Sequence, residues 1–100
     1  MKRRLIRYKV KPEAVAQNRA LVEKVFEELQ HKAPDGVRYL VLAMNDGSFA
    51  HFVETTGDES PLPQLDSHKA FQSGVKQRCL EEPLGVEVSI VGNYRMLASQ

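Results

Sequence analysis

The chain has 100 residues, of which 42% are hydrophobic and 27% are charged, and its formal net charge is +1. This length and composition are typical of one globular domain, so we expect a single domain over residues 1–100 without disorder or a membrane span. The small net charge provides no field that would attract nucleic acid or a lipid surface. The single cysteine, Cys79, excludes an intrachain disulfide, and no apolar leader is recognisable at the N-terminus. We therefore expect a cytoplasmic protein.

The first predicted elements are a strand and a long helix. Residues 4–11 alternate with period two, and one face carries Ile6, Tyr8 and Val10. Pro12 suits the first turn of a helix, and apolar residues then recur at intervals of three and four. The predicted apolar stripe of this helix consists of Ala14, Leu21, Val22, Val25, Phe26 and Leu29. The helix is expected to end before the breaker sequence at residues 34–36.

A β-hairpin is predicted at residues 37–54. Its two apolar runs flank Asn45-Asp46-Gly47-Ser48, and Asn and Gly tolerate the positive φ of tight hairpin turns. Pairing the runs across this turn places on one face Leu40, Leu42 and Met44 with Phe49, His51 and Val53. The other face then carries Tyr39, Val41 and Ala43 with Ala50, Phe52 and Glu54. Both faces of the hairpin are therefore mainly apolar.

A second helix and a last strand follow the breaker-rich loop at residues 55–63. The helix is expected to begin near Asp66 or Ser67, either of which can cap it, and to end at Pro83. Its predicted buried residues are Ala70, Phe71, Val75, Cys79 and Leu80. Gly74 marks either a close packing contact or a weak point within this helix. Residues 86–91 alternate again and predict the last strand, after which residues 92–97 turn outward.

The element order β-α-β-β-α-β predicts an α+β, ferredoxin-like fold with a four-stranded antiparallel sheet. Right-handed crossovers place both helices on one face of the sheet and leave the other face uncovered. A sheet that is apolar on both faces would then expose a larger patch than soluble monomers usually do. We therefore expect a homodimer through the sheet face.

Three stretches resemble a known family, namely residues 8–13 (YKVKPE), residues 46–54 (DGSFAHFVE) and Phe71 in the second helix. They are similar to the antibiotic-biosynthesis-monooxygenase-like (ABM) family of dimeric α/β barrels. The resemblance implies a dimer with a cavity between sheet and helices in each protomer. Members include cofactor-free oxygenases that act on aromatic polyketides or quinols, and haem-degrading enzymes. Haem-degrading members carry a Trp after the third strand and a His one turn beyond the Phe of the second helix. This chain has no Trp, and Val75 stands one turn after Phe71, which argues against that activity.

Two residues are predicted as catalytic. A neutral imidazole at His51, on a mid-sheet strand, can act as a base toward an acidic phenol. The alternative interpretation is a hydrogen-bonded core histidine. Tyr39 shares a face with Glu54 in the pairing above, and Arg7 lies on the adjacent first strand. Such a cluster either binds a polar substrate group or forms a hydrogen-bonded network at a dimer interface.

The predicted substrate-binding residues are Arg7, Phe52, Glu54 and His68. His68 has a second interpretation as a surface residue in the first turn of its helix. The three histidines fall on three separate elements, so we expect no metal site, and we expect no cofactor. Neither a glycine-rich phosphate loop nor a nucleophile elbow is recognisable.

Two function classes remain. The first is a cofactor-independent oxygenase or related small-molecule enzyme for an aromatic or quinol-type substrate in the cavity of a dimeric barrel. The second is a non-catalytic dimeric module that binds a small ligand or only oligomerises. A cavity lined by His51 or Tyr39 favours the first class. A cavity filled by Phe49, Phe52 and Leu42 favours the second.

Overall fold

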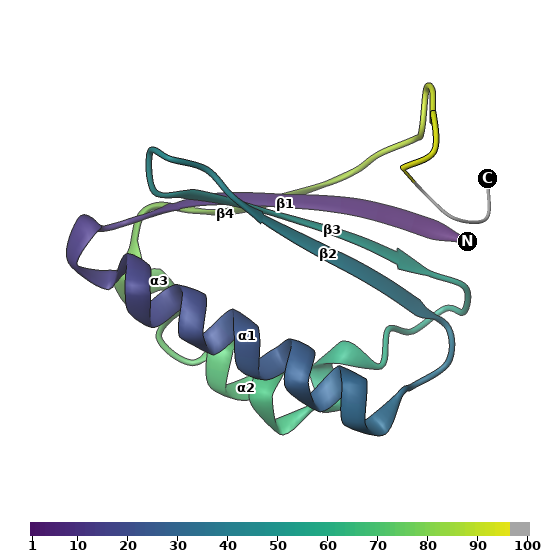
Figure 1. Cartoon of the computed structure of the whole chain (residues 1–100), viewed down its shortest axis with the longest axis horizontal. Coiled ribbons are helices and arrows are strands. Elements are labelled where there is room, and N and C mark those ends of the chain that lie inside the picture. Colours follow the sequence, from purple (N-terminus) through teal and green to yellow (C-terminus); the bar gives the residue numbers. More distant parts are fainter. Residues whose placement is uncertain (97–100) are drawn as a thin grey trace.

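The computed structural model describes residues 1–96, which form a four-stranded antiparallel sheet with helices on one of its faces (Figure 1). The strands are β1 (Lys2–Val10), β2 (Val37–Ala43), β3 (Ser48–Thr55) and β4 (Cys79–Glu87), in the spatial order β2-β3-β1-β4. The helices are α1 (Val15–Lys32), α2 (Asp66–Gln72) and α3 (Val75–Arg78), and 3-10 turns lie at Pro12–Ala14 and Leu62–Gln64. The predicted α+β, ferredoxin-like fold is confirmed.

The hydrophobic core lies between the sheet and the helices. Tyr8 and Val10 of β1 are almost fully buried there, as the alternation of this strand predicts. The α1 stripe is partly as expected, since Val22 and Val25 are buried whereas Leu21, Phe26 and Leu29 are half-buried. Other core members come from β3, from the connection before α2 and from the second helical region, and include Phe49, Val53, Leu62, Leu65, Phe71 and Val75.

The hairpin has a register that differs by one residue from the predicted pairing. Ala43 lies opposite Phe49 and Tyr39 lies opposite Val53. The reason is an odd-numbered loop, in which Met44 N donates to Ser48 O at 2.8 Å and Gly47 adopts φ +88°. Because strand side chains alternate, a slip of one residue moves every β2 side chain to the other face. The predicted faces were therefore wrong.

The corrected register sorts the hairpin side chains clearly. Tyr39 and Val41 join His51 on the face that the helices cover, with Val41 directly opposite His51. Leu40 and Leu42 lie on the opposite face, where Leu40 is the cross-strand partner of Phe52. The polar and aromatic groups of the candidate site thus meet on the helix-covered face.

The second helical region is shorter than predicted. It breaks at Gly74, whose φ of +84° is left-handed, and α3 is a single turn. Pro83 does not end a helix but lies within β4, where the pairing with β1 is irregular between Arg7 and Lys9. A proline is tolerated there because β4 is an edge strand and the irregularity removes the need for its N–H. Leu80 and Ala70 are exposed, contrary to expectation.

The last strand therefore begins at Cys79 and ends at Glu87, several residues earlier than the predicted segment at residues 86–91. Val88 N extends the ladder by donating to Arg3 O at 3.0 Å. The segment that follows rises from the sheet on the side away from the helices (Figure 1). Leu97, the end of the predicted outward turn, lies outside the described residues.

The N-terminus of α2 is capped by a neighbouring helix. Leu65 occupies the N-cap position and no side-chain cap comes from Asp66 or Ser67, so that expectation was wrong. Instead, Glu28 of α1 accepts hydrogen bonds from Ser67 N at 2.9 Å and Ser67 Oγ at 2.5 Å. This contact ties α1 to α2. Within residues 1–96, no helix combines the length and apolar character that crossing a bilayer requires.

Candidate functional site

Five polar side chains form a continuous hydrogen-bonded chain through the core, which we call the polar chain. Tyr39 Oη lies 2.5 Å from His51 Nδ1, and His51 Nε2 lies 2.7 Å from Tyr8 Oη. Asn18 Nδ2 donates to Tyr8 Oη at 3.0 Å, and Arg78 Nε donates to Asn18 Oδ1 at 3.1 Å. Four of the five are buried, with exposures of 0% for Asn18, 2% for Tyr8, 4% for His51 and 6% for Arg78, and Tyr39 is half-buried. Such a buried network is stable only if its members are hydrogen-bonded.

His51 occupies the centre of the sheet and is enclosed by aromatic rings. The ring centroids of Tyr8, Phe71 and Tyr39 lie 5.2, 5.5 and 5.7 Å from that of His51. Burial, with a smaller contribution from the charge of His68, lowers the pKa of His51 to about 4. The imidazole is therefore neutral at physiological pH, with one nitrogen protonated and the other free to accept.

The two tyrosines of the polar chain keep their protons. Burial raises the pKa of Tyr8 to about 12, although the hydrogen bond from Asn18 opposes this shift. Burial also raises the pKa of Tyr39, and Tyr8 adds to the effect. Both hydroxyl groups are hydrogen-bond donors as well as acceptors at neutral pH.

Arg78 anchors the other end of the polar chain. Its Nη2 donates to Phe71 O at 2.8 Å and its Nη1 donates to Ser73 O at 3.3 Å. The guanidinium also lies over the ring of Phe71, 5.2 Å from the centroid. The break at Gly74 makes this possible, because the new turn of α3 begins there and directs Arg78 back toward the end of α2. Within residues 1–96, no carboxylate forms an ion pair with Arg78.

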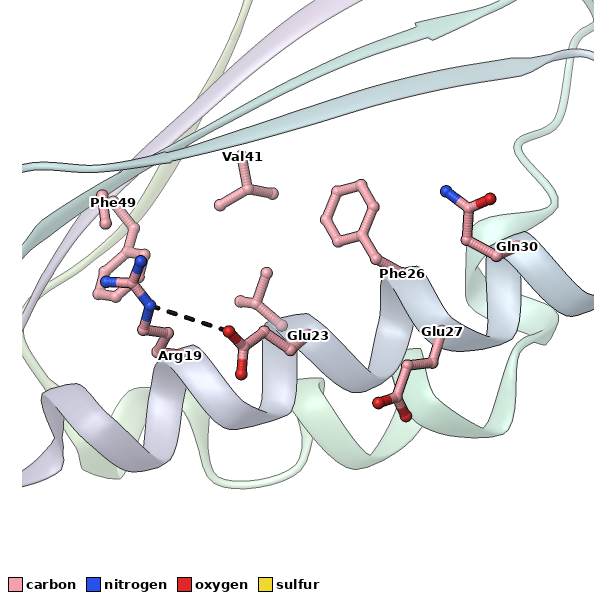
Figure 2. A pocket seen from close by; sticks show the side chains of 9 residues that line it. Arg19, Glu23, Phe26, Glu27, Gln30, Val41 and Phe49 are labelled. Atoms are coloured by element: carbon pink, nitrogen blue, oxygen red, sulfur yellow. Dashed lines mark ion pairs between the residues drawn. The ribbon is translucent and has the colours of Figure 1, made fainter.

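An open cleft of about 470 Å³ lies between α1 and the edge strand β2, and we call it the α1–β2 cleft (Figure 2). Its walls are apolar and consist of Val22, Phe26, Val41, Ala43 and Phe49. Its rim is polar and consists of Arg19, Glu23, Glu27 and Gln30. Figure 2 shows Val41 and Phe26 projecting into the space between the strand and the helix. A volume of this order accommodates a small aromatic molecule of one or two rings.

A second space, of about 220 Å³, lies beside Tyr39 and is bounded by the end of α1 and the start of β2. Phe26 and Gln30 line both this space and the α1–β2 cleft. The ring of Phe26 stacks on that of Tyr39, with centroids 5.0 Å apart and an interplanar angle of 11°. Phe26 therefore forms the wall between the cleft and Tyr39. His51 lines neither space, and its hydrogen bond to Tyr39 connects it to the second one.

The structure brings together the two predicted catalytic residues, Tyr39 and His51, although the predicted register had separated them. It does not bring Tyr39 together with Glu54 and Arg7. Arg7 and Glu54 lie on the opposite face of the sheet, so the predicted cluster was wrong, because its register was shifted by one residue. Glu54 is buried there and forms an ion pair with Arg3 at 2.5 Å.

The remaining predicted binding residues are also outside the polar chain. Phe52 lies on the uncovered face, opposite Leu5 of β1. His68 of α2 is half-buried, with its ring centroid 6.4 Å from that of Phe71, and burial lowers its pKa. Within residues 1–96, no three side chains from His, Cys, Asp and Glu come together as a metal-binding group.

Three members of the polar chain were missed as site residues. Tyr8 was predicted only as a core residue. Asn18 had a recognisable signal, because it lies four residues after Ala14 and four before Val22, within the apolar stripe of α1. A polar amide in such a stripe must find a buried partner. Arg78 carried no comparable signal, since its position depends on the break at Gly74.

Neither a comparison with protein-family models nor one with curated protein sequences finds a match to this chain. Solved structures do resemble it. "Putative antibiotic biosynthesis monooxygenase" from Nitrosomonas europaea has a TM-score of 0.74 and 13% identity, and the match covers 92% of this chain and all of the other (100%). Rv0793 from Mycobacterium tuberculosis has a TM-score of 0.72 and 16% identity, with 92% and 96% covered.

A conserved protein from Methanosarcina mazei is similar to a comparable degree, with a TM-score of 0.69, 22% identity, and coverage of 87% of this chain and 89% of the other. At such identities the likeness shows a common fold. The resemblance to ABM-family proteins that the sequence suggests is thus confirmed at the level of the fold, which several structures named antibiotic biosynthesis monooxygenase share.

Proposed function

We propose that this chain is a small-molecule enzyme of the oxygenase type, whose substrate is an aromatic compound with a phenolic or quinol oxygen. The observation that carries the proposal is that the polar chain ends at Tyr39, directly behind the aromatic wall of the α1–β2 cleft. The names of several structures with this fold support the reaction class.

The cleft suits a planar aromatic substrate. Its walls are the apolar side chains of α1, β2 and β3, and a ring inserted between Phe26 and Phe49 would stack on aromatic surfaces. Because the ring of Phe26 lines the cleft and stacks on Tyr39, a rotation of that ring would open a path for the substrate oxygen toward the tyrosine hydroxyl. Leu42 and Phe52 lie on the other face of the sheet, so they do not fill the cleft.

An oxygenase reaction in which the substrate itself reduces O₂ requires few catalytic groups from the protein. When a phenol reacts with O₂ at a ring C–H carbon, the products are a quinone carbonyl and one water, and the substrate supplies all four electrons that reduce O₂. The protein contributes an apolar space and a polar group that interacts with the phenolic oxygen as charge develops on it. Tyr39 is the group placed to touch that oxygen. His51 acts through Tyr39 and not on the substrate itself.

A non-catalytic module that binds the same class of ligand is the second candidate. The observation that favours it is the burial of His51, which lines neither space and whose pKa is about 4. A histidine of that pKa is a weak base at neutral pH.

Oxygen uptake separates the two candidates. With a naphthol or a naphthohydroquinone as substrate, we expect uptake by the protein above the uncatalysed rate. Tyr39→Phe should lower the catalysed rate by roughly tenfold to a hundredfold, because it removes one hydrogen bond to an oxygen on which negative charge develops. His51→Ala should lower it as well, whereas His31→Gln, an exposed histidine on α1, should not. Uptake equal to the blank in the unmodified protein would refute the enzyme and leave the binding module.

We further propose a homodimer formed through the uncovered sheet face. Leu40, Leu42, Leu84 and Val86 are between 44% and 70% exposed, and the register places them on the side away from the helices (Figure 1). The segment after β4 adds Val91, which is fully exposed. A second copy packed sheet to sheet would remove these apolar groups from water. Small-molecule binding and the dimer then use opposite faces of the same sheet.

A further inference from the structure

The hydrogen bonds of the polar chain have one direction, and Arg78 sets it. A guanidinium donates and never accepts, so the atom of Asn18 that faces Arg78 Nε is the carbonyl oxygen Oδ1. The amide group Nδ2 of Asn18 must then face Tyr8, and it can only donate to the tyrosine oxygen. The side chain of Asn18 thus continues the donor-to-acceptor direction, which we call the polarity, from Arg78 across the core to Tyr8 on β1.

Tyr8 passes the same polarity to His51. Within residues 1–96, the hydroxyl of Tyr8 has two side-chain partners, Asn18 Nδ2 and His51 Nε2. Since Asn18 is a donor, the O–H of Tyr8 has Nε2 as its acceptor. A neutral imidazole carries a single N–H, which must then be on Nδ1, where it donates to Tyr39 Oη. The reverse polarity would bury the O–H of Tyr8 without an acceptor, which is costly.

The series of hydrogen bonds ends at Tyr39, whose hydroxyl proton takes part in none of them. Tyr39 Oη accepts from Nδ1–H of His51, and within residues 1–96 it has no further hydrogen-bond partner. Its own O–H is therefore a donor without an acceptor among the residues that the structure describes. Hydrogen bonds in series polarise one another, and here the series begins at a buried cation, which strengthens the last donor.

We propose that Arg78 and Asn18 are positioning residues that fix His51 as the Nδ1–H tautomer, so that Tyr39 donates its hydroxyl proton to an acceptor oxygen of the ligand. The ligand group is then a quinone carbonyl or a phenolate, not an un-ionised hydroxyl that must give up its proton. The assignment of the ligand group rests on the proposed function, whereas the tautomer does not. His51 is in this account not the base, because the lone pair of Nε2 is engaged by Tyr8.

The tautomer can be measured on the unmodified protein by long-range proton–nitrogen correlation NMR with ¹⁵N-labelled histidine. The signal of His51 is identified by its loss in His51→Gln. We expect Nδ1 to be protonated and Nε2 to carry the free lone pair at neutral pH. Protonation of Nε2 instead would overturn the proposal, and this result needs no other variant to fold.

Asn18→Asp tests the origin of the polarity. The new carboxylate accepts from both Arg78 and the O–H of Tyr8, so Tyr8 turns its proton away from His51 and accepts from Nε2–H. We expect the tautomer to switch from Nδ1–H to Nε2–H. Gln17→Glu is the matched control, because it makes the same change of charge on α1 at an exposed position, and it should leave the tautomer unchanged. An unchanged tautomer in folded Asn18→Asp would contradict the role of Asn18 and Arg78.

The ligand group is tested with 1,4-naphthoquinone, which offers only acceptor oxygens. Tyr39→Phe should weaken its binding by about fivefold to tenfold, the usual effect of losing one hydrogen bond. Binding of naphthalene, which lacks an acceptor, should be the same in both proteins. Equal binding of the quinone to both proteins, or no binding to either, would overturn the ligand assignment, while the NMR result would still decide the tautomer. If only the oxygenase proposal fails, the protein will bind the quinone but will show no oxygen uptake above the blank with the naphthol or the naphthohydroquinone.

Discussion

His51 is a side chain whose two ring nitrogens are both engaged by tyrosines in an aromatic enclosure. The sequence already offered two interpretations of it, a base and a hydrogen-bonded core histidine. The structure shows the hydrogen-bonded core residue, and it also connects that residue to Tyr39. The second interpretation, a hydrogen-bonded core histidine, describes what the structure shows, and a role of His51 in catalysis through Tyr39 stays a proposal.

The depressed pKa of His51 predicts a loss of stability in acid. The folded-state value of about 4 lies below the unfolded value of about 6.5, so the unfolded chain binds more protons between these values. The contribution to the free energy of unfolding is complete above about pH 6.5 and is lost as the pH falls toward about 4. It amounts to about 3 kcal/mol at most, and His68 acts in the same direction.

Urea unfolding of the protein and of His51→Gln at a series of pH values measures this effect. We expect the stability of the unmodified protein to fall more steeply between about pH 6.5 and pH 4 than that of the variant. The exposed His31 provides the control, and His31→Gln should keep the steep dependence. The same pH dependence in His51→Gln would show that His51 does not carry the effect.

For single residues, the sequence predicted which side chains could take part in a site better than it predicted which of them lie together. Tyr39 and His51 are recognisable as chemistry-bearing residues, but whether they share a face depends on one residue in the length of the hairpin loop. An Asn-Asp-Gly-Ser sequence is compatible with both loop lengths, so the face assignment could not be read from it. Asn18 was detectable as a polar residue in an apolar stripe, whereas Arg78 was not.

At the level of elements, the sequence predicted the first strand, the long helix and the hairpin with small errors at their ends. The second helical region failed for a specific reason. Its periodicity continues past Gly74, so the pattern suggested one helix, but Gly74 takes a left-handed conformation and β4 begins soon afterwards. Proline normally argues against a strand, so Pro83 was interpreted as the end of a helix. It is tolerated within β4 because β4 is an edge strand with an irregular ladder.

Gly74→Ala tests the importance of that break. The added Cβ would have room, since the nearest atoms are 3.7 Å away, but an L-residue at φ +84° is strained. We expect a loss of stability of about 1 to 2 kcal/mol. Gly92→Ala, where nothing lies within 4 Å and φ is outside the left-handed range, should change stability little. Chemical denaturation of the two variants measures both values.

The break at Gly74 also bears on the polar chain. Strain at this position would shift the turn that carries Arg78, and through it the donor that faces Asn18. The NMR signal of His51 in Gly74→Ala should therefore move, whereas in Gly92→Ala it should not. A variant as stable as the original protein would show that the left-handed conformation is not required.

For the molecule as a whole, the two faces of the sheet differ in what they carry. The helix-covered face holds the core, the polar chain and the α1–β2 cleft. The other face combines exposed leucines with the Arg3–Glu54 ion pair, and no helix within residues 1–96 covers it (Figure 1). We propose that a second copy of the chain covers this apolar face, since soluble monomers seldom expose such a patch.

Leu42→Asp and Leu84→Asp test that interface, since these leucines are 55% and 70% exposed. A carboxylate buried against apolar groups of the partner would weaken the dimer by more than about tenfold. Sedimentation of the protein at micromolar concentration should show a dimer, and the two variants should shift toward monomer. Ala20→Asp adds the same charge to the exposed side of α1 and should remain dimeric. A monomeric unmodified protein would contradict the proposed assembly.

We propose that an aromatic ligand occupies the α1–β2 cleft with its oxygen at Tyr39. A crystal structure of the protein with 1,4-naphthoquinone tests it most directly. We predict the rings of the ligand between Phe26 and Phe49, with Phe26 rotated and one carbonyl oxygen within hydrogen-bond distance of Tyr39 Oη. A ligand bound on the uncovered sheet face, or in the cleft with Phe26 still stacked on Tyr39, would contradict the account.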